Sequence, residues 1–245
     1  MQYFDRISAE SPAGDGRRWA SVRRAAVGFA RAAILAVIAT MMLAAASAAP
    51  ARAQQSAGDP LVAVKSAIDE ATVVFEDTQI SSAARQQKLR AIAERNFDFE
   101  GMARSTVGAH WRDLTPQQQS EFVPLFTHFI EDVYLTRIQQ YSVEKIQQDI
   151  QSSNVQFTRE ARDDPDDAEV FSTVTLKTEP NPIQVNYLLR PNGDGWRIYD
   201  ITIDAISVIA NYRNQFNRVI NNQGYAALVN ILRQKQQALG ADLAK

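Results

Sequence analysis

The sequence predicts an α+β fold: N-terminal helices, then an antiparallel twisted meander of strands, then two C-terminal helices. Two observations lead to this prediction. Apolar residues recur at helical spacing up to Tyr141 and again after Ile206, whereas the region between them alternates apolar and polar residues. Helices and strands therefore come in separate runs, which is the order expected of an α+β domain. We expect the sheet and the helices to enclose an apolar pocket.

Residues 1–53 have the organisation of a secretory signal peptide. Arginines precede an apolar run from Ala32 to Ala46, and small residues then lead to Ala51-Arg52-Ala53, which fits an A-x-A cleavage site. The run has 15 residues, fewer than the roughly 20 that span a bilayer, so we favour a signal over an uncleaved anchor. The residues after Arg17-Arg18 fit the twin-arginine route poorly, which favours ordinary secretion.

Cleavage after Ala53 would leave residues 54–245 as a single domain. Seven of the 26 basic and three of the 28 acidic residues lie before this point, so the remainder carries a net charge of −6. This charge argues against a nucleic-acid-binding protein, which would usually present a basic face, and against electrostatic docking on anionic lipid. The absence of cysteine excludes disulfides, cysteine nucleophiles and thiolate metal sites.

Helix-start residues divide the first half of the domain. Asp59-Pro60 predicts a helix whose apolar stripe faces inward, because aspartate caps helices and proline fits their first turn. A second helix is expected over residues 81–96, and a shorter third over 97–111. Thr115-Pro116 then predicts a long helix with an aromatic stripe, and Pro124 should kink it or end its first turn. The stripe includes Phe122, Phe126 and Phe129.

Five strand-like stretches follow, and they are separated by turn-forming residues such as DDPDDA and PNGDG. In order, they are YSVEKIQQDI, SNVQFTRE, EVFSTVTLKT, IQVNYLLR and GWRIYDITID. One face of this meander should be an apolar wall, with Val174, Leu176, Val185, Tyr187, Leu189, Trp196, Ile198 and Ile201 on it.

The last strand should pass almost directly into a helix, because no Gly, Pro or Asn separates them. Val208 and Tyr212 begin this helix, which we expect to cover the wall. Gly224 then marks the break before the final helix.

No catalytic or metal motif stands out. His110 and His128 lack any metal-ligand spacing, and Pro165 interrupts the acidic cluster DDPDDAE, which reads as a solvated hairpin turn. Asp200 leaves two readings open: a general base on a strand, or a carboxylate that bonds the backbone at the strand-to-helix junction. No second catalytic group is visible, so we favour the second reading and expect no cofactor and no enzyme activity.

Two segments resemble the MlaC family of periplasmic phospholipid-binding proteins, also called the toluene-tolerance auxiliary family. The first, from Phe97, contains in order F-D-F-x-x-M-A-R, G-x-x-W, T-P-x-Q, E-F-x-x-L-F and Y-x-x-x-x-x-x-Y-S. The second, from Gly195, contains a strand of the type W-x-V-x-D and a helix with Y-R-x-x-F before a glycine. Two features depart from the family pattern: Ala205 stands where glycine is common, and residues 153–164 are an extra strand-like stretch.

The resemblance implies a single lipid-binding domain that shuttles phospholipid across the periplasm. Its partners would be an outer-membrane lipoprotein complex and an inner-membrane ABC transporter with an MCE-type subunit, in keeping with outer-membrane lipid asymmetry. Acyl chains would lie between sheet and helices, against the aromatic stripe, the sheet wall, Val208 and Tyr212. Three alternatives stay open: a hopanoid-associated carrier of the related HpnM branch, a small α+β pocket enzyme that uses Asp200, and an adaptor with a packed core.

Overall fold

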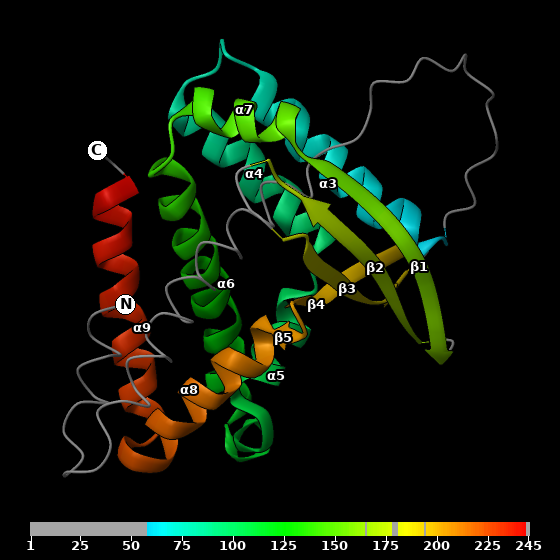
Figure 1. Cartoon of the computed structure of the whole chain (residues 1–245). Helices are drawn as coiled ribbons and strands as arrows, with labels where there is room; N and C mark the ends of the chain where they lie inside the picture. The colour runs from blue at the N-terminus through cyan, green and yellow to red at the C-terminus, as the bar shows by residue number, and fades with distance from the viewer. Residues whose placement is uncertain (1–57, 165, 178–180, 194, 244–245) are drawn as a thin grey trace, which may run out of the picture.

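The computed structural model describes residues 58–243 apart from 165, 178–180 and 194 (Figure 1). The predicted signal peptide, residues 1–53, lies outside the described residues. The α+β prediction is confirmed, because a five-stranded antiparallel sheet lies between two runs of helices. In the described part of the chain, no helix combines the length and apolar character needed to cross a bilayer.

Capping residues set the starts of the N-terminal helices as predicted. The carboxylate of Asp59 accepts hydrogen bonds from two N–H groups of the first turn, and Ser81 caps the next helix. Thr115 and Gln118 form a capping box. The elements are α3 (Pro60–Glu76), α4 (Ser82–Asn96), α5 (Phe99–Val107), a 3₁₀-helix (Gly108–Asp113), α6 (Pro116–Gln139) and α7 (Val143–Ser152).

One helix boundary differs from the sequence prediction. The third helix, expected over 97–111, ends at Val107 because Gly108 has φ of +58°, and the chain continues as a 3₁₀-helix. Of the two outcomes expected at Pro124, a kink or the end of a first turn, the second does not occur, since α6 continues through Pro124 as one helix.

The prediction of a strand over residues 141–150 is wrong, because this segment forms most of helix α7. Ser142 caps the helix by accepting a hydrogen bond from the N–H of Lys145. Ile146 and Ile150 lie one turn apart on the buried face, next to Leu89 of α4. The helical spacing of these two isoleucines after a serine cap outweighs the short alternation around them.

The sheet is a simple meander in which consecutive strands are neighbours. The extra strand-like stretch forms the edge strand beside β2. Each of the three predicted breaks between strands contains residues outside the described part of the chain, namely 165, 179–180 and 194. The strands are β1 (Asn154–Asp164), β2 (Asp167–Thr175), β3 (Ile183–Asn192), β4 (Gly195–Ile203) and β5 (Ile206–Ser207).

A β-bulge at Tyr199 sets which side chains of β4 face inward. Leu188 pairs with Asp200, but its neighbour Leu189 pairs with Ile198, so Tyr199 is an extra residue. Because directly paired residues share a face, the bulge keeps Ile198 and Ile201 on the same side despite their odd spacing. The guanidinium of Arg190 lies 4.1 Å from the centre of the Tyr199 ring.

The passage from β4 to helix α8 is less direct than predicted. Asp204 and Ala205, with φ of +47° and +64°, form a two-residue turn between the paired residues Ile203 and Ile206. Positive φ at both positions is the geometry of a type I′ hairpin turn, which favours Asn-Gly or Asp-Gly. The short strand β5 then leads into α8.

We predict that Ala205→Gly raises the free energy of unfolding by about 0.5–1 kcal/mol. The left-handed conformation costs an L-residue about 1–2 kcal/mol, and glycine does not bear this cost. The strain that the substitution relieves exceeds the additional conformational entropy that glycine loses on folding. Urea denaturation would measure the change. Ala210→Gly in α8 is the matched control and should lower stability by about 1 kcal/mol, because its backbone is helical. A loss of stability in Ala205→Gly would contradict the turn geometry.

Two helices close the chain, α8 (Val208–Gln223) and α9 (Tyr225–Leu243). Gly224, with φ of +84°, forms the predicted break between them. In Figure 1, α6, α8 and α9 lie on one side of the molecule, and the sheet with α3 lies on the other. The buried apolar residues form three clusters, which we call the sheet cluster, the aromatic cluster and the α4–α7 cluster.

Candidate lipid-binding site

The sheet cluster is the inner face of β1–β4 with the first turns of α3 packed on it. Val64 and Ile68 of α3 are its helical members, and the indole N–H of Trp196 donates a 2.8 Å hydrogen bond to the carbonyl of Gly58. Eight predicted lipid-binding residues lie here: Val174, Leu176, Val185, Tyr187, Leu189 and Ile198 are buried, and Trp196 and Ile201 are partly buried. The predicted apolar wall therefore exists as one continuous surface.

The aromatic cluster lies among helices α5, α6, α8 and α9. It contains the predicted residues Phe122, Phe126, Phe129 and Tyr212. Sequence reasoning missed Phe216 as a member, although Phe216 is fully buried and its ring contacts all four of them at centroid distances of 5.7–6.4 Å. The sequence spacing could have predicted this, because Phe216 follows Tyr212 by four residues and therefore lies on the same face of the helix.

The two groups of predicted residues do not line one shared cavity. The sheet cluster and the aromatic cluster are separate, with Phe97 packed at the edge of both. Val208, predicted with them, is half-buried and belongs to neither. Each predicted wall is thus packed against its own helices, and a ligand between them would require the clusters to move apart.

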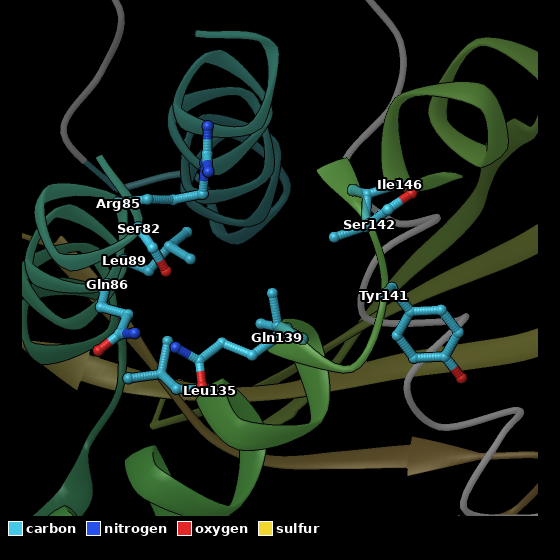
Figure 2. Close-up of a pocket in the computed structure, with 10 residues that line it drawn as sticks. Ser82, Arg85, Gln86, Leu89, Leu135, Gln139, Tyr141, Ser142 and Ile146 are labelled. Carbon is cyan, nitrogen blue, oxygen red and sulfur yellow. The ribbon is translucent and has the colours of Figure 1, made fainter. Parts of the chain in front are cut away.

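A cavity of about 210 Å³ lies elsewhere, where α4 meets the corner between α6 and α7 (Figure 2). Its floor is apolar and its rim polar, and none of the thirteen predicted residues lines it. The lining residues are Ser82, Arg85, Gln86, Leu89, Leu135, Ile138, Gln139, Tyr141, Ser142 and Ile146. An engineered apolar cavity of about 150 Å³ admits benzene, so this cavity could take only a short piece of an acyl chain.

The profile of the MlaC protein family matches residues 65–234, most of the described chain. The chain belongs to the MlaC family. No curated protein sequence is significantly similar to it.

A solved structure has the same fold as this MlaC-family protein. It is a phospholipid-binding protein from Ralstonia solanacearum in complex with a phospholipid, 25% identical in sequence, with a TM-score of 0.59. The similarity covers 74% of this chain and 99% of that one. The resemblance stated from the sequence is therefore confirmed for both family and fold.

Asp200 of the MlaC-family chain occupies a structural position at the start of α8. One carboxylate oxygen accepts hydrogen bonds from the N–H groups of Ile201 and Ile209, at 2.8 and 3.1 Å. The other accepts from the hydroxyl of Ser207 at 2.5 Å, and that hydroxyl caps α8 in turn. Both oxygens of this buried carboxylate are thus engaged with the helix N-terminus, where negative charge is stabilised.

Burial raises the pKa of tyrosines in the aromatic cluster and on β4 above their ordinary value. Burial and the nearby Tyr134 raise the pKa of Tyr212 above its ordinary value, although Arg137 acts in the opposite direction. Burial, followed by the carboxylate of Asp167, raises the pKa of Tyr199 to about 12.

Neither His110 nor His128 belongs to a group of three metal ligands in the described part of the chain. Within the described ranges, no group of three or more His, Asp or Glu side chains could hold a metal ion. His110 lies in the 3₁₀-helix, and the half-exposed side chain of His128 lies 3.5 Å from Glu131.

Proposed function

We propose that this protein is a periplasmic carrier that holds the acyl chains of a phospholipid between its sheet and its helices. One observation carries the proposal: a family relative of the same fold, matched over 99% of its length, is a phospholipid-binding protein in complex with a phospholipid. The carrier would receive lipid from one membrane complex and deliver it to another. The partners are an outer-membrane lipoprotein complex and an inner-membrane MCE-type ABC transporter.

The energetics of transfer explain why a carrier needs two large apolar walls. Each methylene removed from water contributes about 0.8 kcal/mol, so two chains of about 16 carbons represent on the order of 25 kcal/mol. Free diffusion would have to supply this energy, whereas a dry protein surface offsets it. The sheet and aromatic clusters offer such surface, and no bond has to break.

Loading must separate these walls. Pockets for drug-sized ligands, which are smaller than a phospholipid, usually have about 300–1,000 Å³, and this already exceeds the cavity between α4, α6 and α7. A protein that binds lipid only in a more open conformation shifts toward that conformation as lipid binds. Release then follows when a partner favours the closed form.

We predict that protein purified from the periplasm of a Gram-negative host yields phospholipid on organic extraction, detected by mass spectrometry. Hopanoid in the extract would instead assign the protein to the HpnM type. Protein that is empty, and stays empty after incubation with phospholipid vesicles, would contradict both forms of the proposal.

Two adjacent residues provide a matched pair of variants for this experiment. Ile201 lies on the inner face of β4, while Thr202 lies on the opposite face. Ile201→Glu should reduce the bound lipid about tenfold or more, because a carboxylate against acyl chains carries a large desolvation penalty. Thr202→Glu should keep the wild-type lipid content. Circular dichroism would establish that both variants are folded.

A further inference from the structure

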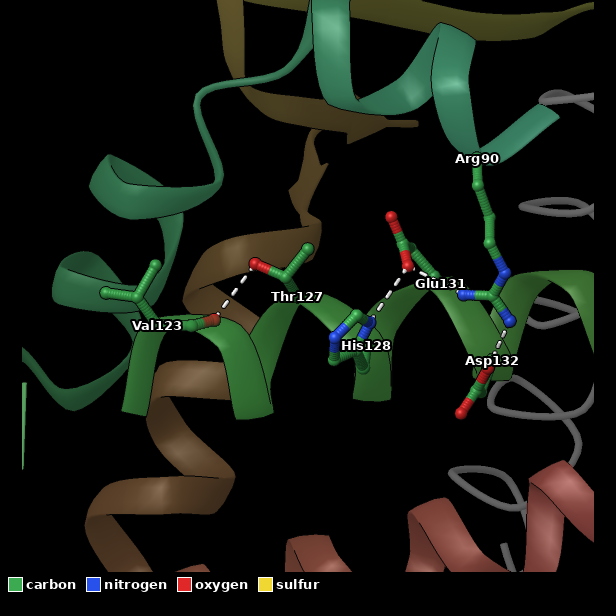
Figure 3. A network of polar contacts seen from close by, with 6 residues as sticks. All are labelled: Arg90, Val123, Thr127, His128, Glu131 and Asp132. Carbon is green, nitrogen blue, oxygen red and sulfur yellow. Dashed lines mark hydrogen bonds and ion pairs between the residues drawn. The ribbon is translucent and has the colours of Figure 1, made fainter. Parts of the chain in front are cut away.

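Helix α4 is joined to α6 by a single charged fork. One guanidinium nitrogen of Arg90 donates to Glu131 at 2.6 Å and another donates to Asp132 at 2.5 Å (Figure 3). Among the described residues of these two helices, every hydrogen bond and ion pair found between them comes from Arg90. The same helix carries Arg95, whose exposed ion pair with Glu70 stays within the α3–α4 hairpin.

The fork is costly to bury and so is poorly explained as a device for stability alone. The side chains of Glu131 and Asp132 are only 3% and 9% exposed, and one arginine serves both. Oxygen Oε1 of Glu131 is buried without a hydrogen-bond partner. Buried ion pairs often contribute little net stability compared with apolar residues of the same size, and their best-attested role is to select one arrangement over another.

The cavity described above lies beside this fork, on the same boundary between helices. Leu89 of the cavity floor is the neighbour of Arg90, and Leu135 lies one turn beyond Glu131 on α6. The fork and the cavity therefore belong to one boundary, which we call the α4–α6 seam. One side of the seam is the α3–α4 hairpin, and the other is α6.

The two sides of the seam also belong to different apolar walls. Helix α3, paired with α4, covers the sheet cluster, whereas α6 supplies most of the phenylalanines of the aromatic cluster. Phe129, in the aromatic cluster, lies two residues before Glu131. Movement of α4 away from α6 would thus widen this cavity and carry the helix pair that covers the sheet cluster away from the helix that supplies the aromatic cluster.

We propose that the α4–α6 seam is the portal through which phospholipid acyl chains enter and leave, and that the fork from Arg90 is the latch that holds it closed. This inference rests on the proposed carrier function and adds the position and control of entry. At the existing cavity, α4 and α6 are already partly separated, and opening of the seam would begin there. Its apolar floor would admit the end of a chain before the latch opens fully.

Removal of the latch should speed lipid exchange without abolishing binding. The assay follows a fluorescent phosphatidylethanolamine moving between vesicles of phosphatidylethanolamine and phosphatidylglycerol in the presence of the full mature protein. Arg90→Met should raise the transfer rate about tenfold, which is near the lower end of the coupling measured for close charge pairs. Arg95→Met is the matched control and should transfer at the wild-type rate.

Arg90→Met leaves two buried carboxylates unpaired, so faster transfer could reflect a destabilised protein. A second variant avoids this problem. Arg90→Met combined with Glu131→Gln and Asp132→Asn keeps the shapes of the two carboxyl side chains and removes all three charges. This variant should fold and should also transfer lipid faster than the wild type. A folded triple variant with the wild-type rate would overturn the latch.

Closing the seam covalently tests the portal itself. The chain has no cysteine, so Gln86→Cys and Gln139→Cys, one on each side of the cavity, introduce the only thiols. A reducible bifunctional thiosulfonate joining them should slow transfer at least tenfold, and reduction should restore it. A cross-linked protein as fast as its reduced form would place the portal elsewhere. A wild-type protein that takes up no phospholipid would instead refute the carrier function itself.

Discussion

Phe216→Ala should lower the free energy of unfolding by about 4 kcal/mol, which is the largest single effect we expect. The ring of Phe216 is fully buried and contacts four other aromatic rings in the aromatic cluster. Truncation of a buried phenylalanine removes both its transfer energy and its packing contacts, and it leaves a cavity, at a cost of about 3–5 kcal/mol. Urea denaturation of both proteins at neutral pH would measure the loss.

Two further variants serve as references for the stability loss of Phe216→Ala. Phe216→Leu keeps most of the volume and should lose clearly less stability than the alanine variant. Val73→Ala removes an apolar side chain that is 65% exposed and should change stability by less than about 0.5 kcal/mol. If Phe216→Ala cost no more than Val73→Ala, the aromatic cluster would not be a packed core.

Asp200→Ala should lower the free energy of unfolding by about 3 kcal/mol. The substitution leaves the N–H of Ile209 and the hydroxyl of Ser207 without their buried acceptor, and unsatisfied buried groups cost about 1–3 kcal/mol each. It also removes a negative charge from the N-terminus of α8. Ser207→Ala removes the helix cap and the hydroxyl that donates to Asp200 but keeps the carboxylate, and it should cost about 1–2 kcal/mol.

Asp200→Asn separates a structural carboxylate from a catalytic one. The amide retains one oxygen acceptor but cannot accept from the Ser207 hydroxyl with its nitrogen, so stability should fall by a smaller amount than in Asp200→Ala. A small-molecule activity that disappears in Asp200→Asn while stability stays unchanged would revive the enzyme hypothesis. Denaturation and an assay with small carbonyl compounds, run on the same samples, decide between these outcomes.

The sequence was most informative where local chemistry decides the structure. Helix starts at Asp59-Pro60 and Thr115-Pro116 were correct because each cap is formed within one turn of chain. The members of the sheet wall were also correct, including Ile198 and Ile201, whose spacing only the bulge at Tyr199 explains. Helix α7 was missed because its cap at Ser142 was given less weight than a short apparent alternation.

The parts that escaped prediction depend on contacts between distant segments. The favoured structural reading of Asp200 agrees with its hydrogen bonds to the start of α8, but its partners Ser207 and Ile209 could not be named because they lie across the turn at Asp204 and Ala205. The cavity could not be located because α4, α6 and α7 meet only in the folded chain. Likewise, nothing in the sequence near Arg90 indicates that its partners are 41 and 42 residues away.

The bulge in β4 has a consequence for how this strand could change in length. Without Tyr199, the sequence of β4 would alternate inward and outward side chains without interruption, and every inward residue would keep its partner on β3. Deleting Arg197 or Thr202 would instead turn an apolar side chain out of the wall. Deleting Asp200 would keep the register but remove the carboxylate that accepts hydrogen bonds at the start of α8. Tyr199 is therefore a position at which this strand can lose one residue and keep both its register and that carboxylate.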